Sequence, residues 1–173
     1  TTVFNLKWWN AKGDNATNDA AALQAAWNAC AVNVGTGAAG GTLYIPRPET
    51  YAYVIQGAQT FGNVPAGGHC QIRMESGSLL ANGTWIMPAR NWSWVCEGGG
   101  NASEPSFAHA GPICLLNSNG SQIPHMEIGD GVTSTAFITI KGLQLASLRV
   151  RGAGGGNLTL DQVYITPTAT QAS

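Results

Sequence analysis

The chain has 173 residues, 8 of them Lys or Arg and 9 Asp or Glu, with a formal net charge of −1. Only 10% of the residues are charged, whereas 23 are Gly, which argues against a long solvated helical bundle. The apolar runs fall far short of the roughly 20 residues that span a bilayer. The basic residues are scattered singly, so a stripe for nucleic acid or anionic lipid is excluded. We expect one domain, 1–173, with no nucleic-acid partner and no membrane span.

Three features favour an extracellular, secreted or cell-surface protein. The chain begins Thr1-Thr2-Val3 without Met or a leader, as in a mature chain or a piece of a longer one. It holds four Cys, none in a CxxC pair typical of zinc sites, and six Asn-x-Ser/Thr sequons for glycosylation. The sequence therefore predicts disulfides and glycans but no metal site. The residues are Cys30, Cys70, Cys96 and Cys114, and Asn15, Asn82, Asn91, Asn101, Asn119 and Asn157.

The first regular element is a helix over about residues 19–31. Leu23, Trp27 and Cys30 recur at helical spacing on one face. Thr17, Asn18 or Asp19 can cap the first turn, and Asp19 lies near the positive end of the helix dipole. A Gly-rich run ends the helix, and alternating apolar residues then predict strands. Residues 1–41 are thus expected to form an N-terminal cap region, and residues 42–173 a series of strands.

The segment over residues 3–55 resembles the start of pectate-lyase-like β-helix proteins, a group with rhamnogalacturonase, epimerase-like and tailspike members. The matching runs are Phe4-Asn5-Leu6-Lys7, Ala11-Lys12-Gly13-Asp14 and Gly40-Gly41-Thr42-Leu43-Tyr44-Ile45-Pro46. The sequence departs from the family pattern at Asn15, where Gly is usual, and at Asn18, where Asp is usual. In that family the segment closes one end of a right-handed parallel β-helix, so the resemblance implies an all-β fold and no activity.

An internal repeat independently predicts stacked coils. Residues 138–145 match residues 158–165 at every apolar position, with an offset of about 20 residues. The same alignment places Lys141 beside Asp161. Similar steps extend backwards and predict about five coils, whereas an antiparallel sandwich remains the alternative. The expected inward positions are Ile72, Cys96, Leu116, Ile138 and Leu158.

Four Cys allow three pairings, and the sequence alone does not choose among them. Within stacked coils, Cys30 on the helix is placed to reach the first coil. We interpret the pairs as Cys30 with Cys70 and Cys96 with Cys114, with buried free thiols as the alternative.

Catalytic candidates are few. A polysaccharide lyase needs a base and often calcium held by carboxylates, and a hydrolase needs converging carboxylates. The weak candidates are Glu75, Glu97, Glu127 and Asp130. Glu75 and Glu97 are expected to align on adjacent coils, and Asp130 lies in a Gly-Asp-Gly run typical of a turn. We expect no cofactor, with calcium only if the protein is a lyase.

Two groups of residues are candidates for binding carbohydrate. Arg149 and Arg151 alternate on one strand face and could bind an acidic sugar or only solvate the surface. Trp85 and Trp92 are candidates for a sugar-stacking platform, whereas Trp27, Trp94 and one of Trp8 and Trp9 are expected to be buried.

The end of the chain carries no amphipathic segment to cover a last coil, since residues after Ile165 are small and polar. Two functions follow as hypotheses. The first is a structural, non-catalytic module that associates with copies of itself, by end-to-end or lateral packing, into a fibre or oligomer. The second is the leading part of a lyase or hydrolase acting on pectin-like or other acidic glycans.

Overall fold

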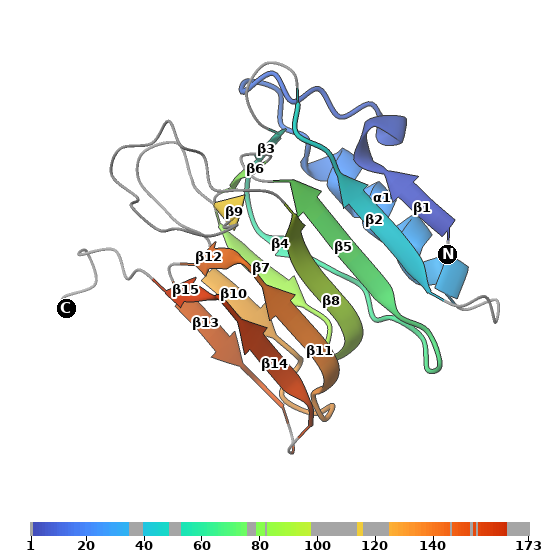
Figure 1. Cartoon of the computed structure of the whole chain (residues 1–173), viewed down its shortest axis with the longest axis vertical. Coiled ribbons are helices and arrows are strands. Elements are labelled where there is room, and N and C mark those ends of the chain that lie inside the picture. Colours follow the sequence, from blue (N-terminus) through green and yellow to red (C-terminus); the bar gives the residue numbers. More distant parts are fainter. Residues whose placement is uncertain are drawn as a thin grey trace.

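Parallel strands make up most of the regular structure (Figure 1). The computed structural model describes residues 2–34, 40–48, 53–75, 79–81, 83–97, 114–115, 125–145, 147–152, 154 and 156–165. Within these residues there are 15 strands, one α-helix and one 3-10 helix. Every strand pairing among them is parallel, which rules out the antiparallel sandwich there. Such a structure fits an all-β or α/β class.

The strands form four sheets. Sheet A contains β1 (Thr2–Asn5), β2 (Gly41–Ile45), β5 (Cys70–Glu75), β8 (Arg90–Glu97), β11 (Ala136–Lys141) and β14 (Leu158–Asp161). Sheet B contains β3 (Tyr53–Ile55) and β6 (Leu79–Ala81). Sheet C contains β4 (Gln59–Thr60), β7 (Thr84–Met87), β10 (His125–Ile128) and β13 (Ser147–Val150). Sheet D contains β9 (Cys114–Leu115), β12 (Leu143–Leu145) and β15 (Tyr164–Ile165).

The chain visits these sheets in a recurring order. It passes from sheet A to sheet B or D, then to sheet C, and then returns to the next strand of sheet A. We call each such passage a coil: β2-β3-β4, β5-β6-β7, β8-β9-β10, β11-β12-β13 and finally β14-β15. Most strands therefore pair with the equivalent strand one coil earlier, as in repeat proteins. The exception among the described strands of the later coils is β9, which pairs with β12 but not with β6.

The predicted repeat is confirmed over the last two coils. Ile138 pairs with Leu158, and Lys141 pairs with Asp161, with 3.1 Å between Nζ and Oδ2. The predicted series of inward positions is wrong in two places. Ile72 pairs with Trp94 rather than with Cys96, and a slip of two residues keeps the same side chains on the inner face, so the apolar pattern does not reveal it. The series also places two steps between Cys96 and Ile138, whereas β8 pairs directly with β11 and Ile138 lies opposite Trp92. Leu116 lies outside the described residues.

The cap region consists of β1, the 3-10 helix η1 (Leu6–Trp9) and the α-helix α1 (Ala20–Val34). The α-helix begins one residue later and ends three residues later than predicted. Asp19 does not cap α1 with its side chain; its two carboxylate oxygens accept from the backbone N–H groups of Lys12 (2.7 Å) and Gly13 (3.1 Å). Asn18 Oδ1 accepts from Ala20 N–H instead (3.1 Å).

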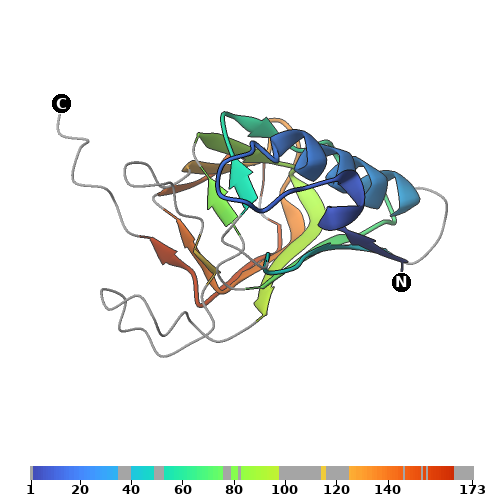
Figure 2. The same ribbon diagram turned by 90° about the horizontal axis from the view of Figure 1, so that it is seen from above.

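The cap covers one end of the stacked coils. Figures 1 and 2 place α1 and β1 at one end of sheet A and β13, β14 and β15 at the opposite end. Leu23, Trp27 and Cys30 are fully buried on the inner side of α1. Trp27 Nε1 donates to Gly62 O (3.0 Å), and Cys30 forms the predicted disulfide with Cys70 at the start of β5. The cap is thus fastened to the second coil.

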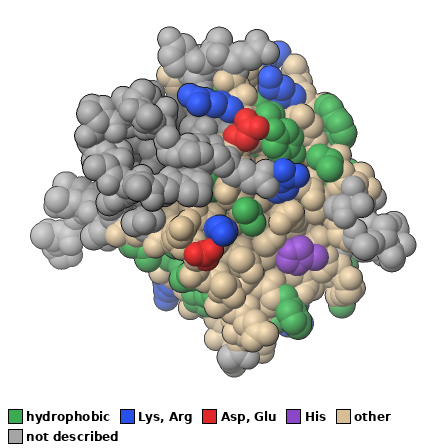
Figure 3. All heavy atoms as spheres, viewed as in Figure 1, with side chains coloured by type: hydrophobic (Ala, Val, Ile, Leu, Met, Phe, Trp, Pro, Cys, Tyr) green, Lys and Arg blue, Asp and Glu red, His purple; other side chains and the backbone are tan. Residues whose placement is uncertain are grey.

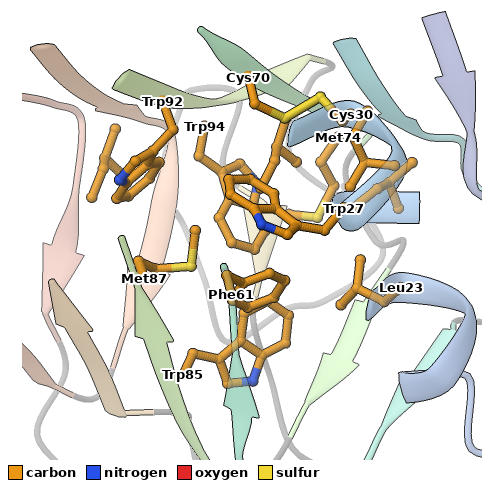
Figure 4. Close-up of a cluster of buried hydrophobic side chains, with 14 of the residues drawn as sticks. Leu23, Trp27, Cys30, Phe61, Cys70, Met74, Trp85, Met87, Trp92 and Trp94 are labelled. Atoms are coloured by element: carbon orange, nitrogen blue, oxygen red, sulfur yellow. A yellow bond between two sulfur atoms is a disulfide. The ribbon is translucent and has the colours of Figure 1, made fainter. Parts of the chain in front are cut away.

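An aromatic stack runs through the core from the cap (Figure 4). The ring centroids of Trp27 and Phe61 lie 5.3 Å apart, those of Phe61 and Trp85 5.4 Å, and those of Trp85 and Trp94 5.4 Å. These distances are within the range of favourable aromatic pairs. The stack connects α1 with three successive coils.

Candidate functional site

The Glu75 carboxylate is held by two donors at the end of β5. One oxygen accepts from the Tyr44 hydroxyl and the other from Arg47 N–H (2.7 Å). The hydrogen bond from Tyr44 is the main cause that lowers the pKa of Glu75 below its usual value. Glu97 pairs with Glu75 in the backbone register, as predicted, and its side chain lies outside the described part.

Glu127 lies in a charged cluster on the outer face of sheet C. Its oxygens lie 3.2 Å from Arg151 Nη1, 3.9 Å from Arg149 Nη1 and 3.3 Å from His125 Nε2. His125 Nδ1 also contacts the Ser147 hydroxyl. The Arg151 hydrogen bond is the main cause of a lowered pKa of Glu127. The structure thus brings together one catalytic candidate and both predicted sugar-binding arginines, and Glu127 offsets part of their positive charge.

Asp130 forms a closed turn, as the Gly-Asp-Gly run predicts. Its carboxylate accepts from the backbone N–H groups of Val132 (2.8 Å) and Thr133 (2.6 Å) and from the Thr133 hydroxyl (2.8 Å). Asp14 makes the same set of bonds with Ala16 and Thr17. In both turns the hydrogen bond from the Thr backbone is the largest cause of a pKa lowered from 3.8 to about 2. Asp130 is therefore a turn-forming residue in this structure.

These turns predict an acid-dependent loss of stability. A carboxylate whose pKa falls on folding stabilises the folded state above pH 3.8, and this contribution is lost as the pH falls towards about 2. Asp130→Asn keeps the acceptor oxygen but does not titrate. We expect the melting temperature of this variant to fall less on acidification than that of the original chain. Thermal unfolding followed by circular dichroism at several pH values measures it, with Asp14→Asn as the matched second site. Equal acid sensitivity of all three proteins would contradict the assignment.

A cavity of about 270 Å³ lies beside the Asp130 turn, between the ends of β4, β7 and β10. Phe61, Ile86, Met87 and Pro88 line its apolar part. Its volume is just below the range of typical ligand pockets. The nearest carboxylate is that of Asp130, which the turn already engages.

The predicted sugar platform is wrong. Trp85 and Trp92 are both fully buried, so neither offers a ring face to a sugar. Trp92 Nε1 donates to Pro88 O (2.7 Å) inside the core. The expected burial of Trp27 and Trp94 is confirmed, and Trp9 packs partly against the core whereas Trp8 is exposed.

The other predicted modification sites have different outcomes. Cys96 is disulfide-bonded, while the side chain of Cys114 lies outside the described residues, so their pairing stays a prediction.

The predicted glycosylation sites differ in exposure. Asn157 is exposed and suited to carry a glycan. Asn91 is buried and donates to Pro65 O (3.3 Å), which contradicts its use as a glycan site in the folded chain. Asn15 is half-buried. Asn82, Asn101 and Asn119 lie outside the described residues.

The last described strands of sheets A, C and D expose core side chains. Leu160, Val150 and Ile165 are 47%, 44% and 50% exposed. Each pairs with a fully buried residue of the preceding coil, and these partners are Ile140, Ile128 and Leu145. The strands β13, β14 and β15 are also edge strands of their sheets in the described residues. We call Val150, Leu160 and Ile165 the terminal face.

The opposite end also exposes apolar groups. Val3 on β1 is 42% exposed and Trp8 on η1 is 68% exposed, and hydrophobic side chains are visible over β1 in Figure 3. The sequence of α1 contains no charged residue. Ala21 and Asn28 are exposed on the side of α1 that faces away from the buried Leu23 and Trp27. We call Val3, Trp8, Ala21 and Asn28 the cap face.

Five of the seven exposed large hydrophobic side chains in the described part of the chain belong to the cap face or the terminal face. The other two are Val132, in the turn before β11, and Phe137, on β11. Sequence reasoning predicted the terminal face but missed the cap face. The signal that could have revealed it is the complete lack of charge over residues 20–34, because a solvent-facing helix usually carries charged residues on its outer side.

Comparisons with family models, with curated proteins and with solved structures gave no match. The family resemblance over residues 3–55 therefore stays a prediction. The described helices include none long and apolar enough to cross a membrane. His, Cys, Asp and Glu side chains do not gather into a metal-binding group in the described ranges.

Proposed function

We propose that this chain is an extracellular structural module, wound as a right-handed parallel β-helix of five coils, that associates end to end with copies of itself. The recurring passage between sheets supports the winding, and right-handed crossovers are the rule between parallel strands. The buried Cys30–Cys70 disulfide fits an oxidising compartment.

The terminal face carries the proposed function. Its three side chains continue core ladders that are fully buried one coil earlier, so covering their exposed halves is worth roughly 1 kcal/mol each. Unpaired edge strands add backbone donors and acceptors that favour pairing with another strand. A structural role is favoured over a lyase or hydrolase because Glu75, Glu127 and Asp130 are each engaged by different neighbouring donors.

Sedimentation velocity over a wide protein concentration range, with electron microscopy of the same samples, tests the proposal. We expect concentration-dependent oligomers or fibres, and we expect Leu160→Lys to abolish them by placing a charge on the terminal face. Ala66→Lys, which adds the same charge on an exposed turn between β4 and β5, should assemble normally. A protein that stays monomeric at all concentrations would overturn the proposal, as would equal assembly of both variants.

A further inference from the structure

The two ends of the molecule share two features. Sheet A reaches both of them, because its outermost described strands are β14 at the terminal face and β1 at the cap face. Both ends also expose apolar side chains. Because β1 pairs with β2 in the parallel direction, as β14 pairs with β11, a second copy placed along the same axis would continue sheet A with parallel strands.

We infer that the terminal face of one copy docks on the cap face of the next, so that copies add head to tail. This inference rests on the proposed self-association and names its second surface. The occupant of the terminal face is thus β1 and the outer side of α1 from another copy of this chain.

The chemistry of α1 fits this role. Its outer side carries Ala21, Ala25 and Asn28, whose short side chains permit close approach of the half-exposed Leu160 and Ile165. A solvent-facing helix usually bears charged residues on its outer side, whereas α1 has none over its 15 residues. The inner side of the same helix already covers the first coil through Leu23 and Trp27. Docking would give the outer side an equivalent apolar neighbour.

The head-to-tail arrangement differs in symmetry from a tail-to-tail dimer. A tail-to-tail pair would join two terminal faces and leave Val3, Trp8 and the uncharged side of α1 exposed. A head-to-tail contact uses one face of each kind, so every added copy presents a new terminal face. Such a heterologous contact produces rings or open filaments rather than a closed pair.

Mixing two blocked variants tests the inference. Leu160→Lys blocks only the terminal face, and the double variant Ala21→Lys with Asn28→Lys blocks only the cap face. We expect each to be monomeric alone and an equimolar mixture to form a heterodimer that grows no further, as measured by sedimentation and by mass photometry. Circular dichroism checks that each variant is folded, and Ala66→Lys again serves as the charge-matched control for Leu160→Lys.

The outcomes are distinguishable. If the original chain does not associate, the proposed function fails and the inference falls with it. If the original chain associates but the cap-face variant associates equally well alone, self-association stands and the head-to-tail inference is overturned. A cap-face variant that halts at a homodimer would identify tail-to-tail pairing. Two monomeric variants that do not combine would also overturn the inference.

Discussion

Replacing Trp94 with Ala is expected to lower the free energy of unfolding by about 3–5 kcal/mol. Trp94 is fully buried and its ring is one end of the aromatic stack with Trp85, Phe61 and Trp27. Truncation would therefore leave a cavity in the middle of the coils. Urea-induced unfolding followed by circular dichroism measures the change. Trp8→Ala, at a residue that is 68% exposed, is the control and should cost less than about 1 kcal/mol.

The indole nitrogens provide a finer test of the same core. Trp92 Nε1 donates to Pro88 O (2.7 Å), whereas Trp94 Nε1 is buried and finds no acceptor among the described residues. Trp92→Phe should therefore be about 1 kcal/mol more destabilising than Trp94→Phe, because it leaves the Pro88 carbonyl unpaired. A larger loss for Trp94→Phe would contradict the described hydrogen bonding.

Removing the Cys30–Cys70 disulfide is expected to cost about 4 kcal/mol, from the chain entropy of a closed loop of this length. The two residues are separated by 40 positions in the sequence. The double variant Cys30→Ala with Cys70→Ala would release α1 from β5, so its midpoint of urea unfolding should fall strongly. The control is Cys96→Ala with Cys114→Ala, which leaves the cap bond intact. A loss below about 1 kcal/mol in the cap variant would show that packing of Leu23 and Trp27 alone holds the helix.

Sequence patterns predicted the coils best where two strands match at both apolar and polar positions. The pairing of Ile138 with Leu158 follows from matching apolar and Thr positions over a short offset. The pairing of Ile72 was misjudged by two residues, because strands repeat every two residues and such a slip leaves the inner face unchanged. The alternation of apolar and polar residues within a strand therefore predicts which side chains face the core better than it predicts which residues pair across strands.

The candidate site was less predictable. The polar Ser93 between Trp92 and Trp94 indicates that both rings point to the other face of β8, yet sequence alone does not say which face is the core. Burial settles this for the described strand. The contact of Glu127 on β10 with Arg151, the residue after β13, joins two residues that are 24 positions apart in sequence. It depends on the register between β10 and β13, which the composition of neither strand fixes.

The covalent link between α1 and β5 also predicts the order in which the coils unfold locally. The strands β2, β3 and β4 lie between the linked residues in sequence, so the first coil stays tethered at both of its ends while the bond is intact. The coil β14-β15 has a described neighbour on one side only and no such tether in the described chain. In stacked repeats each unit is held by its neighbours, so amide hydrogen exchange should slow progressively from β14 towards the helix.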